Sequence, residues 1–411
     1  MWSSTTPVGL CARLVLVPCL LASSLVLAGP PDSIDPGVRR FFAEVLAGHA
    51  EIRAAEAEIA AARARVAGAR RPLYNPELEG ELESKEATIA PVLGLSQTLD
   101  LYGRGGANAA LAARRLATAR ARRDQVALTL LDALVSALAD LQGARALVHL
   151  GEERVALLER LQRLTERRRQ AGDVGAQDLA LARIALAEGR AGLAMAQARL
   201  AGARGALEEA AGRPLDAWPS LPEVPAAPEI DEDLLQRLPE VRLALAESLG
   251  AQAEIRVAER DTRADPTVGV RLGRDVNENF LGVNLAVPLF VRNDFREGVR
   301  ASSAAASAAA ARAEGVRQIA GRRLAGARAR YRLLRDAWEG WRAQGGDEIP
   351  RWRRLLERLW RNGEISTPDY LVQIQQGLDT QAAGVELQNR LRGAWVALMS
   401  AAGLWLEGEQ R

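Results

Sequence analysis

The chain has 411 residues, of which 48% are hydrophobic and only 4% aromatic, so alanine supplies much of the apolar content. Its mean hydropathy of −0.09 excludes a polytopic helical membrane protein, because each span needs about 20 mostly apolar residues and we find no such run after the N-terminus. The 54 basic and 52 acidic side chains leave a net charge of +2, which excludes a large single-sign surface for nucleic acid.

Residues 1–28 are predicted to be a signal peptide. Arg13 precedes the interrupted apolar stretch Leu14–Leu27, which ends in small residues suited to cleavage. An uncleaved signal anchor is the alternative. Cys11 and Cys19 both lie in this segment, so the mature chain is expected to hold no disulfide, cysteine zinc site or cysteine nucleophile.

The rest of the chain is an internal duplication, with a first repeat over 29–213 and a second repeat over 240–411. Four anchors recur in the same order at offsets of 188 to 191 positions: Asn75–Leu78 with Asp265–Val268, Gly94–Tyr102 with Gly282–Phe290, Gly172–Leu179 with Gly363–Tyr370, and Ala210–Gly212 with Ala401–Gly403. A unit of about 190 residues is too long for a solenoid repeat. We therefore expect a pseudo-two-fold fold made of two halves.

In the first repeat, the spacing of apolar residues predicts a helix over 37–70 and then changes to a period of two. Residues 75–102 are therefore predicted to form a hairpin. The helical period returns over 104–171, where one helix would span about 100 Å, and a second long helix is predicted over 176–212.

The segment 214–239 is rich in proline, which predicts an extended crossover without helix. The second repeat then follows the same plan, with a hairpin over 265–290 and long helices over 292–362 and 367–402. Gly345-Gly346 and Pro350 are expected to break or kink the first of these helices.

The fold class predicted from these elements is mainly α with a small transmembrane β part. Four strands cannot close a barrel, and open edges are not tolerated in lipid. Three chains would supply twelve strands for a closed β-barrel, and their long antiparallel helices would continue it as an α-helical barrel.

This order of elements resembles the TolC-like outer-membrane efflux proteins over essentially the whole mature chain. Asn75–Leu78 and Leu95–Arg104 look most like the CzcC-like branch, the outer-membrane components of heavy-metal RND efflux systems. The resemblance implies a homotrimer in outer-membrane lipid that extends into the periplasm of a Gram-negative bacterium. It also implies two partners, a periplasmic adaptor and an inner-membrane RND pump.

The resemblance places the adaptor contact at two periplasmic turns. The residues concerned are Gly172, Asp173, Val174, Asp178, Gly363, Glu364, Ile365 and Asp369. Glycine permits each turn and the aspartates can cap the returning helices, so simple helix-helix turns are the alternative. Some family members carry a further acidic residue one turn on, where this chain has Val372.

A set of polar residues is predicted to face the lumen of the barrel: Glu77, Glu79, Glu81, Glu83 and Asn284. An acidic ring there would favour cations, although a solvated strand face explains the same alternation. We expect no cofactor, because Gly103–Gly106 lacks a complete phosphate-loop fingerprint. The two histidines, His49 and His149, lie on different predicted helices and offer no metal-ligand spacing.

The expected function is therefore a channel without enzyme activity, because the chain has no constellation of nucleophile, base and orienting group. Heavy-metal cations are the expected cargo, and organic drugs or toxicants are the alternative. A periplasmic coiled-coil scaffold without a pore is the rival from another class, since amphipathic helices alone would suit it. The two alternating hairpins argue against a scaffold.

Overall fold

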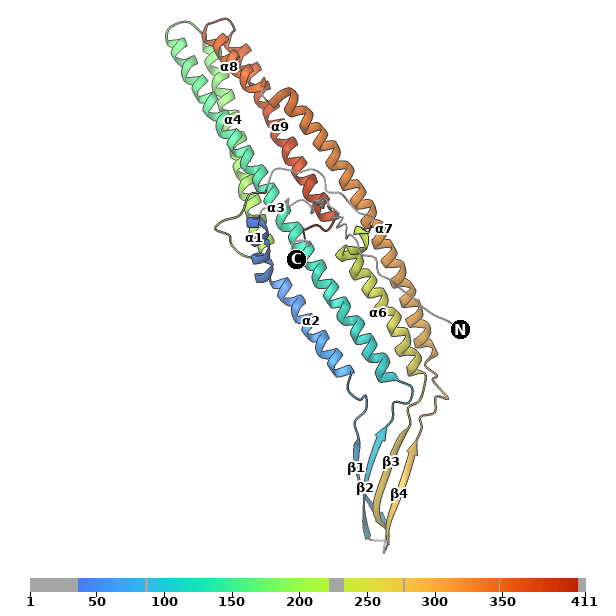
Figure 1. Cartoon of the computed structure of the whole chain (residues 1–411). Helices are drawn as coiled ribbons and strands as arrows, with labels where there is room; N and C mark the ends of the chain where they lie inside the picture. Colours follow the sequence, from blue (N-terminus) through green and yellow to red (C-terminus); the bar gives the residue numbers. More distant parts are fainter. Residues whose placement is uncertain (1–35, 86–87, 222–232, 276–277, 347, 406–411) are drawn as a thin grey trace, which may run out of the picture.

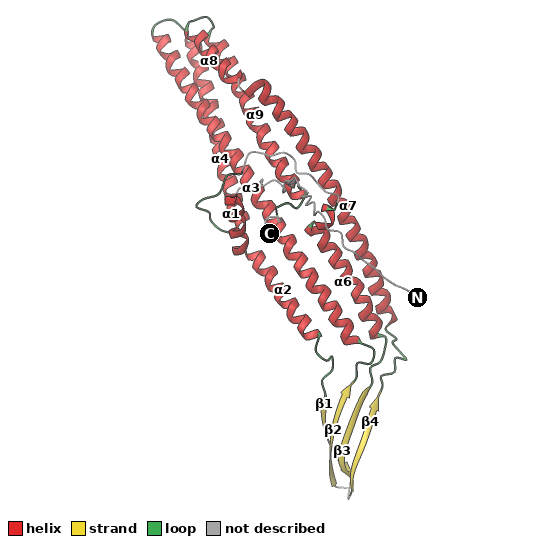
Figure 2. Cartoon of the chain, in the orientation of Figure 1, coloured by secondary structure: helices red, strands yellow, loops and turns green. Residues whose placement is uncertain are grey.

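The chain is an elongated molecule with long helices over most of its length and a β-sheet at one end (Figure 1). The computed structural model describes residues 36–85, 88–221, 233–275, 278–346 and 348–405. The predicted signal peptide, 1–28, lies outside the described residues. Figure 2 shows that helices and strands occupy separate parts of the molecule, so the predicted mainly α class with a small β part is confirmed.

The first repeat contains α1 (Pro36–Gly48), α2 (Ala50–Ala69), β1 (Glu77–Lys85), β2 (Thr88–Thr98), α3 (Arg104–Gln170) and α4 (Ala176–Ala211). The single helix predicted over 37–70 is divided at Gly48 and His49. The imidazole Nδ1 of His49 accepts a hydrogen bond of 3.3 Å from the backbone N–H of Glu51 and caps α2. His49 is therefore the N-capping residue of α2.

The second repeat contains α6 (Pro239–Asp261), β3 (Thr267–Asp275), β4 (Glu278–Ala286), α7 (Arg296–Trp341), the π-helix η1 (Arg342–Gly346), α8 (Glu348–Arg361) and α9 (Thr367–Ala401). The expectation that 214–239 holds no helix is wrong at its end. A short helix, α5 (Leu234–Arg237), lies there, and α6 begins at Pro239. Proline is tolerated at this first helical position because its missing N–H has no intrahelical partner there.

The four strands form one antiparallel sheet in the order β1-β2-β3-β4. The two hairpins meet through β2 and β3, where Leu95 pairs with Val270. Each strand thus neighbours the next strand in the sequence. Within the described residues, β1 and β4 are the edges of the sheet, and each leaves one side without a partner strand.

The helical part is stabilised by two main groups of buried side chains. One lies around the middle of the molecule and joins α1, α3, α7 and α9, and the other lies near the end opposite the sheet and joins α3, α4, α8 and α9. Fully buried alanines such as Ala127 and Ala182 let helix axes approach closely. Helix against helix packing therefore replaces a thick aromatic core.

One part of α3 differs from the sequence expectation. The helix contains an 18-residue window with a mean hydropathy of 1.4, which is apolar enough to cross a membrane by composition. However, 56% of this window is buried inside the structure, and the neighbouring α2, α4, α6 and α9 pack along α3. Its apolar residues therefore belong to the helical core.

Candidate functional site

The sheet has one strongly apolar face that none of the described residues covers. Leu78 is 78% exposed and Val283 is 82% exposed, although both lie within strands. Alternation along each strand places their apolar neighbours on the same side. The exposed apolar residues on this face are Leu78, Leu82, Leu93, Leu95, Val268, Val270, Leu272, Leu281, Val283 and Leu285.

The opposite face is polar and carries the residues predicted to face a lumen. Glu77, Glu79 and Glu81 alternate with the leucines of β1 and are exposed. Asn284 lies on the same face, in line with Glu77 across the register Glu77–Ser96–Gly269–Asn284. Glu83 pairs with Ala90, and its side chain lies outside the described part.

The strands meet the helices at a network centred on Arg104, which sequence reasoning missed. The guanidinium Nη1 donates a hydrogen bond of 2.8 Å to the Tyr74 hydroxyl and lies 3.3 Å from Oδ2 of Asp265. Its Nε lies 3.1 Å from Oδ1 of Asp261, and Nη2 donates to the Arg263 carbonyl at 2.9 Å. Arg104 of the first repeat thereby binds the segment that leads into the second hairpin.

The same network contains a buried carboxylate. The side chain of Asp265 is only 4% exposed, and its Oδ2 accepts a hydrogen bond of 2.8 Å from the Tyr74 hydroxyl. Burial and this hydrogen bond raise the pKa of Tyr74. A buried carboxylate beside a guanidinium indicates a fixed joint between sheet and helices.

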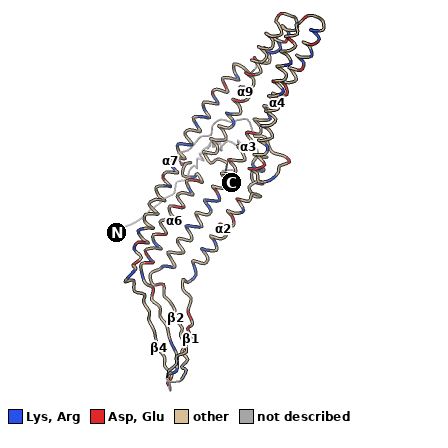
Figure 3. Tube along the Cα trace, turned by 180° about the vertical axis from the view of Figure 1, so that it is seen from behind, with Lys and Arg blue, Asp and Glu red and all other residues tan. Residues whose placement is uncertain are grey.

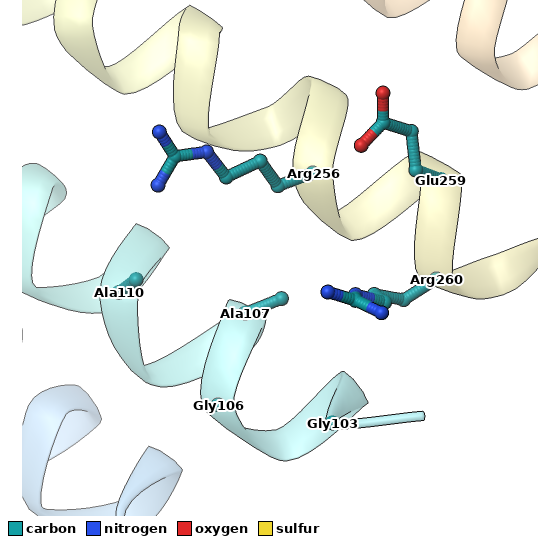
Figure 4. A pocket seen from close by; sticks show the side chains of 7 residues that line it. All are labelled: Gly103, Gly106, Ala107, Ala110, Arg256, Glu259 and Arg260. Atoms are coloured by element: carbon teal, nitrogen blue, oxygen red, sulfur yellow. The ribbon is translucent and has the colours of Figure 1, made fainter. Parts of the chain in front are cut away.

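The segment Gly103–Gly106 is a strand-to-helix junction in the structure. Both carboxylate oxygens of Asp100 accept backbone N–H bonds of 2.7 Å, from Arg104 and from Gly105. The carboxylate of Asp100 thus satisfies N–H groups of the first turn of α3. Beside it, Figure 4 shows a pocket between α3 and α6, lined by Gly103, Gly106, Ala107, Ala110, Arg256, Glu259 and Arg260.

At the other end of the molecule, α3 and α4 join through a tight turn. Gly172 has φ of 86°, the left-handed conformation that favours glycine. Its N–H donates to the Arg169 carbonyl at 3.0 Å, and the Asp173 N–H donates to the Arg168 carbonyl at 2.9 Å, which satisfies the end of α3. Asp178 then accepts a 2.9 Å hydrogen bond from the Gly175 N–H.

The turn between α8 and α9 repeats this geometry. Gly363 has φ of 78°, and the Glu364 N–H donates to the Leu359 carbonyl at 2.9 Å. The Ser366 hydroxyl donates to Asp369 at 2.6 Å and accepts from its N–H at 3.2 Å. Asp178 and Asp369 therefore take part in capping α4 and α9.

The other residues of the two turns divide into two groups. Asp173 and Glu364 are exposed, whereas Val174 is half-buried and Ile365 packs against the apolar group at this end of the molecule. Val372 on α9 is 64% exposed. Between its helices, each turn therefore exposes one acidic side chain, close to the exposed Arg169 at the end of α3 and the exposed Arg361 at the end of α8.

Arg168 joins the two turns, and this tie was also missed in the sequence. Its Nη2 donates hydrogen bonds of 3.2 Å and 2.8 Å to the carbonyls of Trp360 and Arg361, the last residues of α8. The guanidinium also lies 4.9 Å from the centre of the Trp360 ring. The positive charge of Arg168 is favourable at the C-terminus of α8, where the helix dipole is negative, and it is also favourable over the face of the Trp360 indole ring.

The aromatic groups below the second turn are tightly packed. Trp360 stacks on Tyr370 with ring centres 4.7 Å apart, and the indole N–H donates to the Thr367 hydroxyl at 3.3 Å. Burial raises the pKa of Tyr370 to about 12. The two turns are therefore held as one rigid end.

The described residues contain no group of three or more His, Asp or Glu side chains placed to hold a metal ion. His149 is exposed and lies 3.7 Å from Glu153 on the same helix. Acidic and basic residues are both spread along the helices (Figure 3), and α7 has only basic charged residues from Arg317 to Arg335.

The first repeat is similar in sequence to a known protein family. Residues 42–213 match the sequence model of a family described as "Outer membrane efflux protein". The first repeat is therefore similar to this family. The match covers nearly the whole predicted first repeat, with its hairpin and both long helices. The search of curated proteins found no match.

Solved structures share the fold of both repeats. CusC, whose structures describe transmembrane channel formation, superposes with a TM-score of 0.75 at 18% identity, over 90% of this chain and 92% of that chain. The CmeC outer membrane channel of Campylobacter jejuni gives 0.75 at 16% identity, over 90% and 86%. The open state of the MtrE outer membrane channel of Neisseria gonorrhoeae gives 0.73 at 18%, over 90% and 89%. At these identities the likeness concerns the fold, and it extends through the second repeat.

Proposed function

We propose that three copies of this chain form an outer-membrane channel of a tripartite efflux system. The observation that carries this proposal is a four-stranded sheet with one exposed apolar face and two unpaired edges. An apolar face in water is unfavourable, and an open edge in lipid leaves backbone groups without hydrogen-bond partners. Closure with two further copies removes both problems at once.

The dimensions of the strands support this arrangement. β1 and β3 have nine residues and β2 has 11, which matches the 9 to 11 residues of a tilted strand that crosses a bilayer. The leucine and valine face would contact lipid and the glutamate face would line the lumen. A water-soluble scaffold would not need such a sheet.

The test is membrane fractionation, followed by sizing of the species extracted in detergent. A protein recovered with outer membranes and extracted at three times the chain mass supports the channel. A water-soluble monomer would contradict it. Conductance of the extracted trimer in a planar bilayer separates a pore from a closed membrane assembly.

Heavy-metal cations are our proposed cargo. The polar face carries the acidic residues Glu77, Glu79 and Glu81 on one strand of each chain, and rings of acidic side chains favour cations. A conduit needs no tight ligand cluster, because a metal that binds firmly leaves slowly. Deletion of the gene, with survival measured across metals and organic toxicants, tests the cargo. Unchanged metal tolerance would assign the channel to organic compounds.

The two turns at the end opposite the sheet are our proposed contact with the periplasmic adaptor, which links the channel to an inner-membrane RND pump. Their matched geometry and the tie through Arg168 give one rigid surface, on which Asp173 and Glu364 are exposed. A basic or hydrogen-bonding adaptor segment suits these two carboxylates.

The paired substitution Asp173→Arg with Glu364→Arg tests this contact and leaves the left-handed glycines untouched. We expect loss of adaptor capture and of efflux, with normal trimer assembly. Glu152→Arg, an exposed site on α3 away from the turns, is the matched control. Full efflux in the double variant would exclude the turns as the adaptor site.

A further inference from the structure

Three of the large side chains on the polar face of the sheet each lie over a glycine of the neighbouring strand. Arg271 pairs with Gly94, Phe280 with Gly273, and Asn284 with Gly269. A Cβ on Gly94 would lie 3.2 Å from Cγ of Arg271, and a Cβ on Gly273 would lie 2.6 Å from the Phe280 ring. These side chains therefore rest on the wall in space that only glycine leaves open.

Arg271 carries a charge that is opposite to the rest of this face. Among the strand side chains that the structure describes, Arg271 is the only basic one on the polar face. Arg274 lies three residues further along β3, so its side chain points to the opposite face. Glu79 lies on the far side of Gly94, with Oε2 3.6 Å from the same Cβ position. No ion pair joins Arg271 to a described carboxylate within 4.0 Å, so its charge stays exposed beside the acidic strand.

We propose that Arg271 is a specificity-determining residue of the channel, and this inference rests on the trimeric function proposed above. Three copies would place a ring of guanidinium groups at the level of Glu79, between the levels of Glu77 and Glu81. A positive ring in an acidic lumen opposes cation passage and attracts small anions. Arg271 thereby limits how strongly the pore prefers cations.

The glycine beneath it sets how far this charge reaches into the pore. Gly94 lets the aliphatic stem of Arg271 lie along the wall beside Glu79, since Cγ of Arg271 and Oε2 of Glu79 lie 3.2 Å and 3.6 Å from the same Cβ position. A methyl group at position 94 would push the stem away from the wall and toward the axis. Gly282 provides the comparison, because it lies on the same face and has no atom within 4 Å of its Cβ position.

The test is the reversal potential of the purified trimer in a planar bilayer with a potassium chloride gradient. We expect Arg271→Gln to raise the ratio of cation to anion permeability roughly threefold, because three fixed charges leave the lumen. Arg274→Gln, on the other face, should leave the ratio unchanged. Gly94→Ala should lower the single-channel conductance, whereas Gly282→Ala should not.

The outcomes separate this inference from the function on which it rests. A conducting wild-type trimer whose selectivity is the same in Arg271→Gln overturns the role of Arg271 and leaves the channel standing. A wild-type trimer that does not conduct contradicts the channel itself. Equal conductance in the two glycine variants would refute the positioning by Gly94.

Discussion

The two helical arms of the molecule differ although they follow matching hairpins. α3 runs unbroken for 67 residues, whereas the second arm is divided into α7, the π-helix η1 and α8. The break coincides with Gly345-Gly346, and Pro350 lies in the first turn of α8, where its missing N–H costs little. Duplicated halves can thus keep the same ends while their middles diverge.

Aromatic side chains fill the divided region of the second arm. Trp338 and Trp341 stack with ring centres 5.3 Å apart, and the Trp341 ring packs against Gly384 of α9. Trp352 packs in the same way against Gly377. The straight arm, formed by α3, therefore keeps its shape through one unbroken helix. The divided arm, formed by α7, η1 and α8, keeps its shape through tryptophan rings that pack against glycines of α9.

The largest expected effect concerns the feature that both repeats share, the apolar strand face. Leu95→Arg in β2 and its counterpart Val283→Arg in β4 should each impair membrane assembly by about 2–4 kcal/mol if they lie at the middle of the bilayer. The fraction of heat-resistant trimer in outer membranes measures this. Leu95→Phe is the apolar control, and normal assembly of both arginine variants would contradict the lipid-facing assignment.

The next largest effect is expected where Trp341 of the divided arm packs against Gly384. Gly384→Ala would drive a methyl group into the Trp341 ring and should lower the free energy of unfolding by about 1–3 kcal/mol. Gly393→Ala on the same helix meets no atom within 4 Å and should stabilise the protein by about 0.5–1 kcal/mol. Thermal unfolding of the extracted protein measures both, and equal shifts would show that the fit of Trp341 is unimportant.

A smaller effect is expected where the straight arm joins the divided one. Arg168→Ala removes two hydrogen bonds to the end of α8 and the contact with Trp360, at a cost of about 1–2 kcal/mol. Hydrogen exchange of the amides after Arg361 should accelerate. Arg169→Ala, an exposed neighbour, should leave exchange unchanged, and slow exchange in Arg168→Ala would show that the tie does not hold the turns together.

The last expected effect depends on pH and on a contact between the repeats. Burial raises the pKa of Asp132 on α3 from 3.8 to about 6, opposed by a hydrogen bond with Ser400 and by Arg323. Because the folded pKa is the higher one, the free energy of unfolding should fall as pH rises from about 4 through about 6. Asp132→Asn should remove this dependence and be more stable than wild type by about 1–2 kcal/mol at pH 8.

Unfolding followed at several pH values, with and without the substitution, measures that difference. Parallel pH profiles for the two proteins would mean that the carboxyl of Asp132 ionises equally in both states. The neighbouring ionisable groups Arg323 and Glu240 are present in both proteins, so they do not account for a difference between them.

Local patterns predicted the elements that repeat along the chain. The period of two within 75–102 identified the first two strands, because alternation is a property of the strand itself, although β2 ends at Thr98, before the end of the predicted hairpin. The turn at Gly172 and its copy at Gly363 were visible for the same reason, since a left-handed residue after a helix favours glycine. The prediction was wrong at the end of the crossover. The many prolines in 214–239 indicated extended chain, although Pro239 is the first residue of α6.

The sequence by itself determined the duplication, the four strands, the two long arms and the chemistry of each strand face, because periodicity and turn residues act over a few neighbours. Only the tertiary structure decided which distant groups meet. The network of Arg104 with Asp265, the tie from Arg168 to α8, and Arg271 lying over Gly94 each join residues more than 150 positions apart. Such contacts depend on how whole elements pack, and packing leaves no periodic trace in the residues that make it.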